Sequence, residues 1–584
     1  MPSSRLEVNS RGESILYFRN SGERQVSFFF DGALLNVPWD NRLDAQSIAT
    51  EVIGKMQIAK GSSSILYGPN TIGGAVSINT FERVGEGQTN ILRMQGMDGG
   101  GYFLSGTSHN RTGNSNLIVN FSRLGQAGNI ISNPPDYTVY NQGEGSSLQT
   151  NSDISRTSGY IRAETELGDW KLGVGLLAFD GEKGVIPQNH RRQRTRFWRY
   201  SRYSRIMAIG NAMYEGGWFD MRNTIWVDGF RQDISKYESI DYESRESLQR
   251  DKDDTYGIRS IWDSDLWGGM LSISGLGYLS KHSEKESGTT SDFAQTTWSL
   301  GSEYRKTYEE FSFAAGASFD GTGIIEAGEF DGSEGKVIND WSALLGLGYD
   351  LESYGSLFAN ISRKTRFPTL REQFATVDRF VVNPELAPET AILSELGYSY
   401  RGDGLEMNIT GFVSLVDGVI ETVQIDTSGL EMRVNLDEAT IYGVEVDGGA
   451  DFNDWASLLY NSTYSQSTGT VNGVSQELES RPDLSGFFRL MLEPIPSLDG
   501  FTFQPELQYD AWQFSRNAIG ELEEIGFQYA MNLRLAYKFI TGSDNPSVFE
   551  AFARVDNITN EKYLYKIGFA RPGRTFVAGV SAIL

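Results

Sequence analysis

The chain has 584 residues, a formal net charge of −25 at pH 7, no Cys, and hydrophobic and aromatic contents of 39% and 12%. The lack of cysteine excludes thiolate metal sites, disulfides and cysteine catalysis, and the negative charge argues against a chain built to bind nucleic acid. The three histidines, His109, His190 and His282, lie far apart in the sequence, so no histidine-based metal or catalytic cluster is expected.

The first 85 residues predict a small mixed domain. Residues 24–37, RQVSFFFDGALLNV, indicate two short strands joined by a turn at Asp31 and Gly32. Residues 44–61 contain a short helix-like patch followed by a strand, and residues 73–80, GGAVSINT, predict another strand. A domain of this size has little core of its own, so we expect residues 1–85 to pack against the rest of the chain.

One segment of this domain, KGSSSILYGPNTIGGAVSINT at residues 60–80, has the GxxxxG spacing of a phosphate-binding loop. That chemistry needs Lys and then Ser or Thr directly after the second glycine, whereas Gly74 and Ala75 follow Gly73 here. The preferred interpretation is that its glycines serve turns and close backbone packing. These glycines are Gly61, Gly68, Gly73 and Gly74.

From residue 86 to residue 584, apolar side chains alternate with small or polar ones in segments paired across turns. In residues 341–350, for example, Trp341, Leu345, Leu347 and Tyr349 share one face. We count about 22 such segments, within the range of outer-membrane barrels. A soluble β-sandwich would rarely sustain this alternation over so many long hairpins. The sequence contains no run of 18 apolar residues, so it predicts no membrane-spanning helix.

The connections between these segments fall into two classes. One class is tight, as in ELGDW, DLWGG and RGDGL, whereas the other is long and polar. The long connections are residues 125–153, 181–196, 233–254, 365–390 and 467–479. Short turns at one end and long loops at the other are typical of outer-membrane barrels. The predicted fold is therefore all-β, an antiparallel transmembrane barrel of about 22 strands over residues 86–584, with residues 1–85 as a plug in its lumen.

Several motifs in a fixed order point to a known family. The first domain contains VSFFFDGALL and KMQIAKGSSSILYGPNTIGGAVSINT, and the barrel contains SRKTRFPTLREQF, NPELAPETAILSELGYSY, ATIYGVEVDG and VDNITNEKYLYKIGFARPGRTFVAGV. Together they resemble the TonB-dependent receptors, outer-membrane transporters whose N-terminal plug lies inside the barrel. The resemblance covers nearly the whole chain. The family begins with a signal peptide and a TonB box, and we expect the plug here to be a partial one that lacks both.

The resemblance implies a function and partners. It implies a location in the outer membrane of a Gram-negative bacterium and active uptake of a large, scarce nutrient, above all a ferric siderophore. TonB with its inner-membrane energising complex, outer-membrane lipids and lipopolysaccharide are the implied partners, and we expect a monomer without a cofactor. The alternatives are a cobalamin or saccharide transporter of the same family, a surface receptor without energised transport, and a passive porin-like channel.

Two barrel glutamates carry a specific hypothesis. Alternation within residues 392–400 and 442–449 turns Glu395 and Glu445 toward the lumen, where carboxylates need positive partners. In the family, two barrel glutamates pair with two basic plug residues, and the matching plug positions here are Arg19, in YFRNSG, and Lys60. We therefore expect these four residues to form a plug–barrel lock. The alternative is that both carboxylates meet lumen water.

Residues 190–205, HRRQRTRFWRYSRYSR, hold seven Arg among interleaved aromatic residues. Arginine pairs bidentately with carboxylates and phosphates and stacks on aromatic rings, so this segment predicts an outward-facing site for an anionic ligand such as a ferric siderophore. The candidate ligand-binding residues are Arg194, Arg196, Trp198, Arg199 and Arg202. Two alternatives are contacts with lipopolysaccharide phosphates and neutralisation of acidic loops such as residues 237–254.

No constellation predicts an enzyme. The nucleophile motif GxSxG does not occur, and no histidine lies between Phe367 and Asn383, where haem receptors of the family tend to carry one. We therefore expect no catalytic residues, no metal site and no haem.

Overall fold

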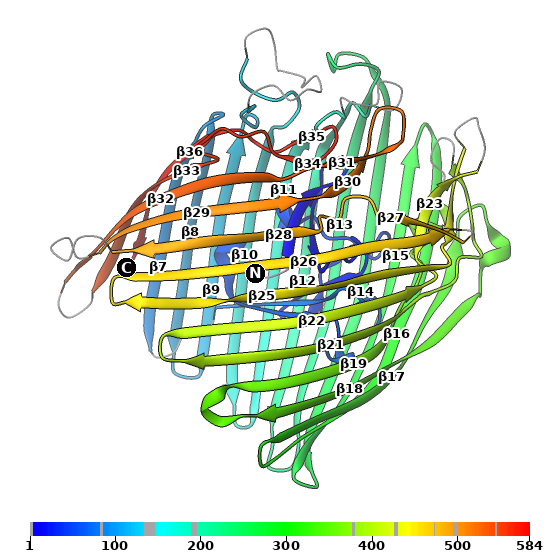
Figure 1. Cartoon of the computed structure of the whole chain (residues 1–584). Helices are drawn as coiled ribbons and strands as arrows, with labels where there is room; N and C mark the ends of the chain where they lie inside the picture. The colour runs from blue at the N-terminus through cyan, green and yellow to red at the C-terminus, as the bar shows by residue number, and fades with distance from the viewer. Residues whose placement is uncertain are drawn as a thin grey trace.

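The computed structural model describes residues 4–81, 86–132, 146–188, 195–375, 380–425, 430–471, 473–493, 500–542 and 546–584. Most of these residues lie in one closed antiparallel barrel with a small domain inside it (Figure 1). In the described part of the chain, no helix is long and apolar enough to cross a membrane.

The barrel strands follow one another along the chain and around the wall. They are β7 (Gly87–Met97), β8 (Gly101–Thr112), β9 (Ser115–Gln126), β10 (Ile154–Leu167), β11 (Trp170–Gly184), β12 (Trp198–Glu215), β13 (Asp220–Tyr237), β14 (Arg245–Leu266), β15 (Gly269–Glu286), β16 (Thr289–Tyr308), β17 (Phe311–Ala327), β18 (Val337–Asp350), β19 (Ser356–Arg366), β21 (Glu389–Gly402), β22 (Leu405–Asp417), β25 (Glu438–Asn453), β26 (Ala456–Val471), β27 (Val474–Glu477), β28 (Leu484–Leu492), β29 (Phe501–Ala511), β32 (Gln528–Thr541), β33 (Ser547–Asp556) and β36 (Thr575–Ile583).

Pairing of β36 with β7 closes the ring, with Val577 opposite Met97. The short strand β27 and the strand β28 pair with different ends of β26, so they occupy one position and the barrel has 22 strands, as predicted. Closure gives every strand two neighbours, which satisfies the backbone hydrogen bonds that lipid cannot satisfy.

The period-two alternation sorts side chains between lipid and lumen. On β11, Val174 is 67% exposed on the outer face, whereas Leu177, three residues further on, is buried. On β18, Leu345 and Leu347 face outward, and the preceding Leu344, an apolar residue in the polar register, is buried on the inner side. The wall therefore presents an apolar belt to the membrane.

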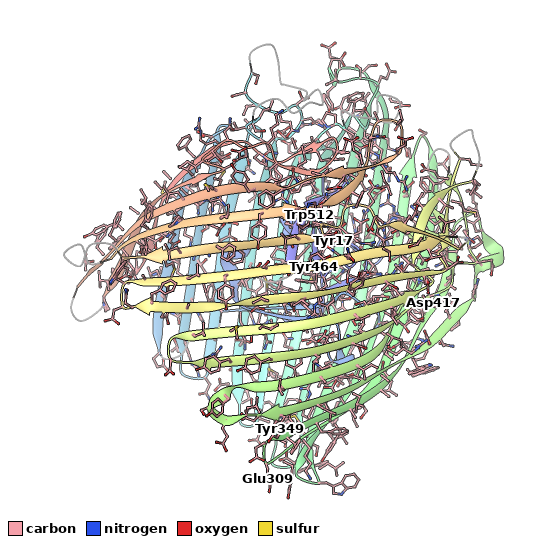
Figure 2. The ribbon with its side chains drawn as sticks, viewed as in Figure 1. Tyr17, Glu309, Tyr349, Asp417, Tyr464 and Trp512 are labelled. Atoms are coloured by element: carbon pink, nitrogen blue, oxygen red, sulfur yellow. The ribbon has the colours of Figure 1, made fainter. Side chains whose placement is uncertain are left out.

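The two classes of connection lie at opposite ends of the barrel. Tyr349 and Glu309 mark the end with tight turns (Figure 2). One predicted long loop is wrong, because residues 233–254 are mostly strand: β13 continues to Tyr237 and β14 begins at Arg245. Residues 467–479 likewise continue β26 and add β27. These strands extend the wall on the side of the long loops.

The loop end also carries small elements. They are the helix α1 (Leu370–Phe374), the 3₁₀ turn η4 (Asp331–Ser333), the sheet of β20 (Phe380–Val381), β23 (Ile420–Gln424) and β24 (Glu431–Asn435), the hairpin of β30 (Gln513–Arg516) and β31 (Leu522–Ile525), and the hairpin of β34 (Leu564–Lys566) and β35 (Phe569–Ala570). A further 3₁₀ turn, η5 (Glu352–Tyr354), lies at a tight turn. Thr369 and Glu372 form a capping box that starts α1.

The N-terminal domain contains a hairpin, a four-stranded sheet and three 3₁₀ turns. The hairpin is β1 (Ser4–Val8) with β2 (Ser14–Phe18), the sheet has the order β4 (Ala33–Leu34), β3 (Val26–Phe30), β6 (Gly74–Thr80) and β5 (Ile53–Lys60), and the turns are η1 (Ala45–Ser47), η2 (Thr50–Val52) and η3 (Ile65–Tyr67). Figure 1 shows this domain, in blue, inside the ring of barrel strands.

The core of this plug is shared with the barrel wall. Phe29 and Ile78 of the plug sheet belong to one buried cluster with Tyr160, Met207 and Trp226 of barrel strands. A domain this small cannot bury enough apolar surface alone, so the wall supplies the missing half of its core. The plug is thus positioned by the side of the barrel that β10, β12 and β13 form.

Candidate functional site

A charged joint connects the plug to the barrel wall on the side of β21 and β25. Arg19 follows directly after β2 and has a positive φ of 47°. Its guanidinium donates through Nη1 to Glu395 and through Nη2 to Glu445 Oε1 at 2.6 Å. Lys60, the last residue of β5, places Nζ 2.8 Å from the same Glu445 Oε1. The structure thus brings all four predicted lock residues together.

These charges are largely removed from water. The side chains of Arg19, Glu395 and Glu445 are 7%, 8% and 4% exposed. Burial alone would lower the pKa of Arg19, but Glu445 and Glu395 outweigh it, so the pKa is raised and the guanidinium stays charged. Burial lowers the pKa of Lys60, against the opposing effect of Glu445. A buried cluster of this kind is held by mutual charge, and loss of one partner leaves another unpaired.

The segment after Lys60 continues the contact with the wall. The Ser62 amide donates to Glu395 Oε1 at 3.0 Å, and the Ser64 hydroxyl donates to Glu303 Oε2 at 2.7 Å. Lys364, buried on β19, donates to the Ser63 hydroxyl at 2.5 Å. Each of the three serines therefore has its own partner on the barrel. The segment therefore docks the plug onto the barrel wall, and its serines serve this contact and not a phosphate.

The glycines of this segment occupy positions where a side chain does not fit. Gly61 has a φ of 53°, and a β-carbon there would press against Glu395 and Arg19. Gly74 has a φ of 135°, and its close neighbour is the carbonyl of Ala59 on the adjacent strand. Gly68 also has a positive φ, and Gly73 lies against Ser21.

A second polar contact lies at the turn that Asp31 and Gly32 form. Asp31 Oδ2 accepts from Tyr160 at 2.7 Å and from Arg162 Nη1 at 3.0 Å, both on β10. Its Oδ1 accepts from the Thr80 amide at 3.0 Å, at the end of the plug sheet. One carboxylate therefore ties the turn both to the plug strand β6 and to the wall.

An ion-pair network covers the plug on the side of the long loops. Asp40 pairs with Arg24 at 2.7 Å and also with Arg42 and Arg371, the last of which lies on α1. Glu23 pairs with Arg24 at 3.1 Å and Arg42 at 3.2 Å. Burial would raise the pKa of Asp40, yet the guanidinium groups of Arg24, Arg371 and Arg42 hold it well below its usual value. This network connects the plug to an outer loop.

The described arginines of the arginine-rich segment lie in different surroundings. Arg196 Nη1 donates to the plug residue Ser10, with its hydroxyl at 2.6 Å, and its guanidinium stacks 4.7 Å from the Trp198 ring centroid. Arg199 forms a bidentate pair with Asp153, with both contacts at 2.7 Å. Both arginines have partners within the chain, and Arg199 neutralises an acidic residue, in line with the second alternative.

The other two arginines proposed to bind a ligand are Arg194 and Arg202. Arg194 is outside the described residues. Arg202 donates to the Ser204 hydroxyl at 3.2 Å and is exposed. Because Arg205 reaches the Leu35 carbonyl of the plug at 2.7 Å and so faces inward, alternation turns Ser204 and its partner Arg202 to the outer face. Arg196, Arg199 and Arg202 thus face different surroundings, and ligand binding by this segment stays a prediction.

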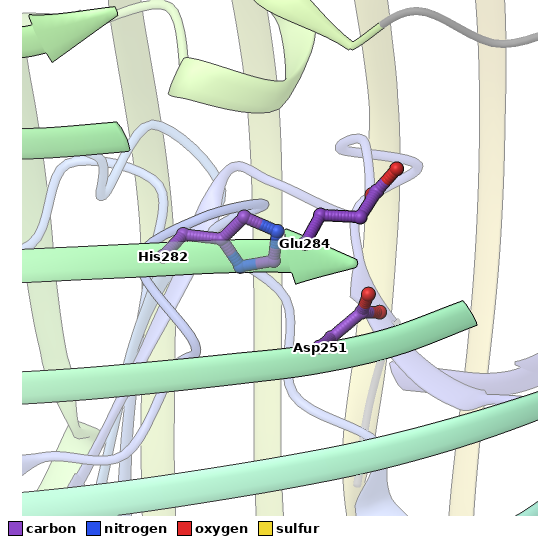
Figure 3. Close-up of side chains that lie close together, drawn as sticks. All are labelled: Asp251, His282 and Glu284. Carbon is purple, nitrogen blue, oxygen red and sulfur yellow. The ribbon is translucent and has the colours of Figure 1, made fainter. Parts of the chain in front are cut away.

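Sequence separation argued against a histidine cluster, but the structure brings His282 together with two carboxylates. Asp251 on β14 and His282 and Glu284 on β15 place potential ligand atoms within 4.8 Å of one another (Figure 3). A signal for this group was present in the sequence. Asp251 and Glu284 are equally distant from the tight turn of Trp267 and the following glycine, so a hairpin pairs them across the strands.

Both the barrel and the plug match known protein families. Residues 178–558 match the family model of the TonB-dependent receptor β-barrel, and residues 3–75 match that of the TonB-dependent receptor plug domain. Among curated proteins, the chain is similar to the vitamin B12 transporter BtuB of Photobacterium profundum, with 22% identity over 443 residues, 74% of this chain and 66% of the relative. The match thus spans slightly less than two thirds of that relative's length.

Solved structures share the architecture. The copper transporter OprC superposes with a TM-score of 0.84 and 16% identity, over 100% of this chain and 94% of OprC. The FrpB iron transporter from Neisseria meningitidis (F3-3 variant) superposes with a TM-score of 0.81 and 12% identity, over 100% of this chain and 95% of FrpB. At these identities the likeness establishes the fold, a plugged barrel.

Proposed function

The chain belongs to the TonB-dependent receptors, whose barrels lie in the outer membrane, and we propose that it actively takes up a large, scarce nutrient, above all a ferric siderophore. In this proposal the ligand binds among the outer loops and the top of the plug. TonB, with its inner-membrane energising complex, then displaces the plug and opens the lumen. The protein acts as a monomer in contact with outer-membrane lipids and lipopolysaccharide, and it makes or breaks no covalent bond of its cargo.

The observation that carries this proposal is the charged joint of Arg19 and Lys60 with Glu395 and Glu445. Ion pairs and hydrogen bonds can be broken by force and then formed again, because each group regains the same partner when the plug returns. A permanent stopper would gain more from apolar packing, since replacing buried ion pairs by well-packed hydrophobic residues is often neutral or stabilising. The charged joint is therefore the part of the plug–barrel contact that is suited to release and return, beside the apolar core that the plug shares with the wall.

Similar proteins support a scarce nutrient as cargo. Their names include an iron transporter, a copper transporter and a vitamin B12 transporter. A cobalamin or a saccharide is the alternative cargo.

An uptake assay tests the proposal. Cells that carry the protein in their outer membrane are given a panel of ⁵⁵Fe-loaded siderophores, in parallel with an otherwise identical strain that lacks TonB. We expect accumulation of at least one ferric siderophore, and its loss both without TonB and after collapse of the proton motive force. Equal accumulation with and without TonB would instead identify a passive channel, and binding without accumulation would identify a surface receptor.

A further inference from the structure

We propose that Asp251, His282 and Glu284 form a binding site for a divalent first-row transition-metal cation on the inner wall of the barrel, beside the plug. The site lies near the start of β14 and the end of β15, away from the turn at Trp267 (Figure 3). This inference concerns residues outside the charged joint. Its role in capturing cargo rests on the proposed function, whereas metal binding itself does not.

The hairpin register assembles the site. Asp251 lies directly opposite Glu284, and Asp253 lies directly opposite His282. Because side chains two residues apart on a strand share a face, these four residues form a compact group on the lumen side. The potential ligand atoms of Asp251, His282 and Glu284 all lie within 4.8 Å of one another. A single cation in their midst can reach all three with little movement of side chains.

The imidazole is already oriented for coordination. Nδ1 of His282 lies 2.8 Å from Asp253 Oδ1, and the ring stacks on Trp39 of the plug, with centroids 3.9 Å apart and planes inclined by 3°. His282 is only 2% exposed, and its Nε2 is buried without a hydrogen-bond partner. Figure 3 shows one ring nitrogen turned toward Glu284. A carboxylate on Nδ1 fixes the tautomer of a metal-binding histidine and leaves the lone pair of Nε2 for the metal.

The two carboxylates share a neutral partner. Among the described residues, neither Asp251 nor Glu284 has an ion-pair partner within 4.0 Å. Their shared contact is the Gln249 amide, whose Nε2 donates to Asp251 at 2.9 Å and to Glu284 at 3.0 Å. A neutral amide offsets the repulsion of two buried carboxylates poorly. A divalent cation would take the position between them that the amide now bridges.

The donor set selects a class of metal. Imidazole suits Zn²⁺, Cu²⁺, Fe and Ni²⁺, whereas Ca²⁺ and Mg²⁺ prefer oxygen ligands alone. Three protein ligands leave coordination positions for water or for donor atoms of a chelator. Glu284 is half-buried and lies two residues before the end of β15, so the site opens toward the loop end. Trp39 links the site to the plug, so an occupied site contacts the element that must move during transport.

Metal binding by the purified full chain in detergent tests the proposal. Calorimetry with Zn²⁺ measures affinity and stoichiometry, and electron paramagnetic resonance with Cu²⁺ detects coupling to an imidazole nitrogen. We expect one tight site per chain with coupling to one nitrogen. Asp253→Asn, which changes only the group that orients His282, is expected to weaken binding roughly 10- to 100-fold. His282→Gln is expected to abolish the nitrogen coupling.

Controls separate the site from folding and from transport. His109→Gln removes a histidine whose Nε2 lies 2.6 Å from Asn116 on another part of the wall, and this variant must bind metal like the unmodified chain. Glu284→Gln serves as the second ligand variant, because its half-buried side chain tolerates substitution better than the stacked His282 does. Unchanged affinity and coupling in both ligand variants would overturn the proposal, as would the lack of a tight site. Intact metal binding without uptake would contradict the proposed transport and leave the site standing.

Discussion

Glu445 on the barrel wall accepts Arg19 of the plug at 2.6 Å, although the two residues lie 426 positions apart in the chain. The same carboxylate oxygen also accepts Lys60 at 2.8 Å. One buried acid therefore compensates two plug cations. Because removal of Glu445 takes a counter-charge from both Arg19 and Lys60, the contribution of this joint is best measured at Glu445.

The first prediction concerns Glu445→Gln. This change keeps the shape of the side chain but leaves Arg19 and Lys60 short of a buried counter-charge, so plug docking is expected to weaken by about 3–5 kcal/mol. The measurement is the urea concentration at which ion conductance through the barrel appears in planar bilayers. Glu406→Gln is the matched control, since Glu406 pairs with Arg401 on the surface, with side-chain exposures of 45% and 78%. If both variants open at the same urea concentration, the joint does not hold the plug.

The second prediction concerns Gly61→Ala. Gly61 has a φ of 53°, and its added methyl group would press on Glu395 and Arg19. The backbone strain alone is expected to cost about 1–2 kcal/mol, and the displaced ion pair adds to it. The same conductance assay should show opening at lower urea. Gly275→Ala is the control, because a β-carbon at Gly275 meets no atom within 4 Å; equal behaviour of the two variants would contradict the tight fit at Gly61.

The third prediction is a pH dependence. Burial would raise the pKa of Glu13, but Arg42 and Arg11 lower it from 4.5 to about 2. A carboxylate whose pKa is lowered by folding stabilises the folded state fully above its unfolded pKa and loses that contribution as pH falls through the folded pKa. The contribution of Glu13 to the stability of the folded plug should thus be constant between pH 7 and 5 and should be lost from about pH 4.5 toward pH 2.

Protease accessibility of the plug over this pH range measures the effect, with pepsin active on the acid side. In Glu13→Gln the contribution is missing at every pH, so the plug of the variant should lose less stability on acidification than the plug of the unmodified chain. An identical acid profile in the two proteins would show that Glu13 is not among the groups responsible.

The fourth prediction separates the arginines of the 190–205 segment. Arg202 faces outward, so Arg202→Ala is expected to leave ligand binding unchanged. Arg196 binds Ser10 of the plug, so Arg196→Ala should ease plug opening without a direct effect on a ligand. Ligand affinity and urea-dependent conductance, measured on both variants, distinguish a role in ligand binding from a role in plug docking. A large loss of ligand affinity in Arg202→Ala would restore that residue to the ligand site.

Much of the fold was predictable because a barrel wall imposes a simple rule on each strand. Leu345 and Leu347 face lipid and Gly346 between them faces the lumen, and this alternation is visible along the barrel strands of the sequence. The lock was predictable in its parts for the same reason: alternation placed Glu395 and Glu445 inward, and the family resemblance indicated their partners on the plug.

The ends of strands and the contacts between residues far apart in the sequence were harder to predict. Charged residues at 233–254 indicated a loop, but above the membrane a strand contacts water on its outer face and tolerates charge there. Arg250 and Lys252, each 58% exposed, occupy such positions. The cluster of Asp251 and His282 depends on hairpin register, which only the position of the turn at Trp267 sets. The partners of Arg196 and Arg199 depend on how loops fold over the plug, and no local pattern encodes this.

Displacement of the plug is the central claim, and a reversible tether tests it most directly. The hydroxyls of Ser62 on the plug and Ser362 on β19 lie 3.2 Å apart, and the chain has no native cysteine. In Ser62→Cys combined with Ser362→Cys, oxidation should join plug and wall. The account predicts that uptake stops on oxidation, that ligand binding persists, and that reduction restores uptake. Uptake at the same rate through the tethered barrel would contradict it.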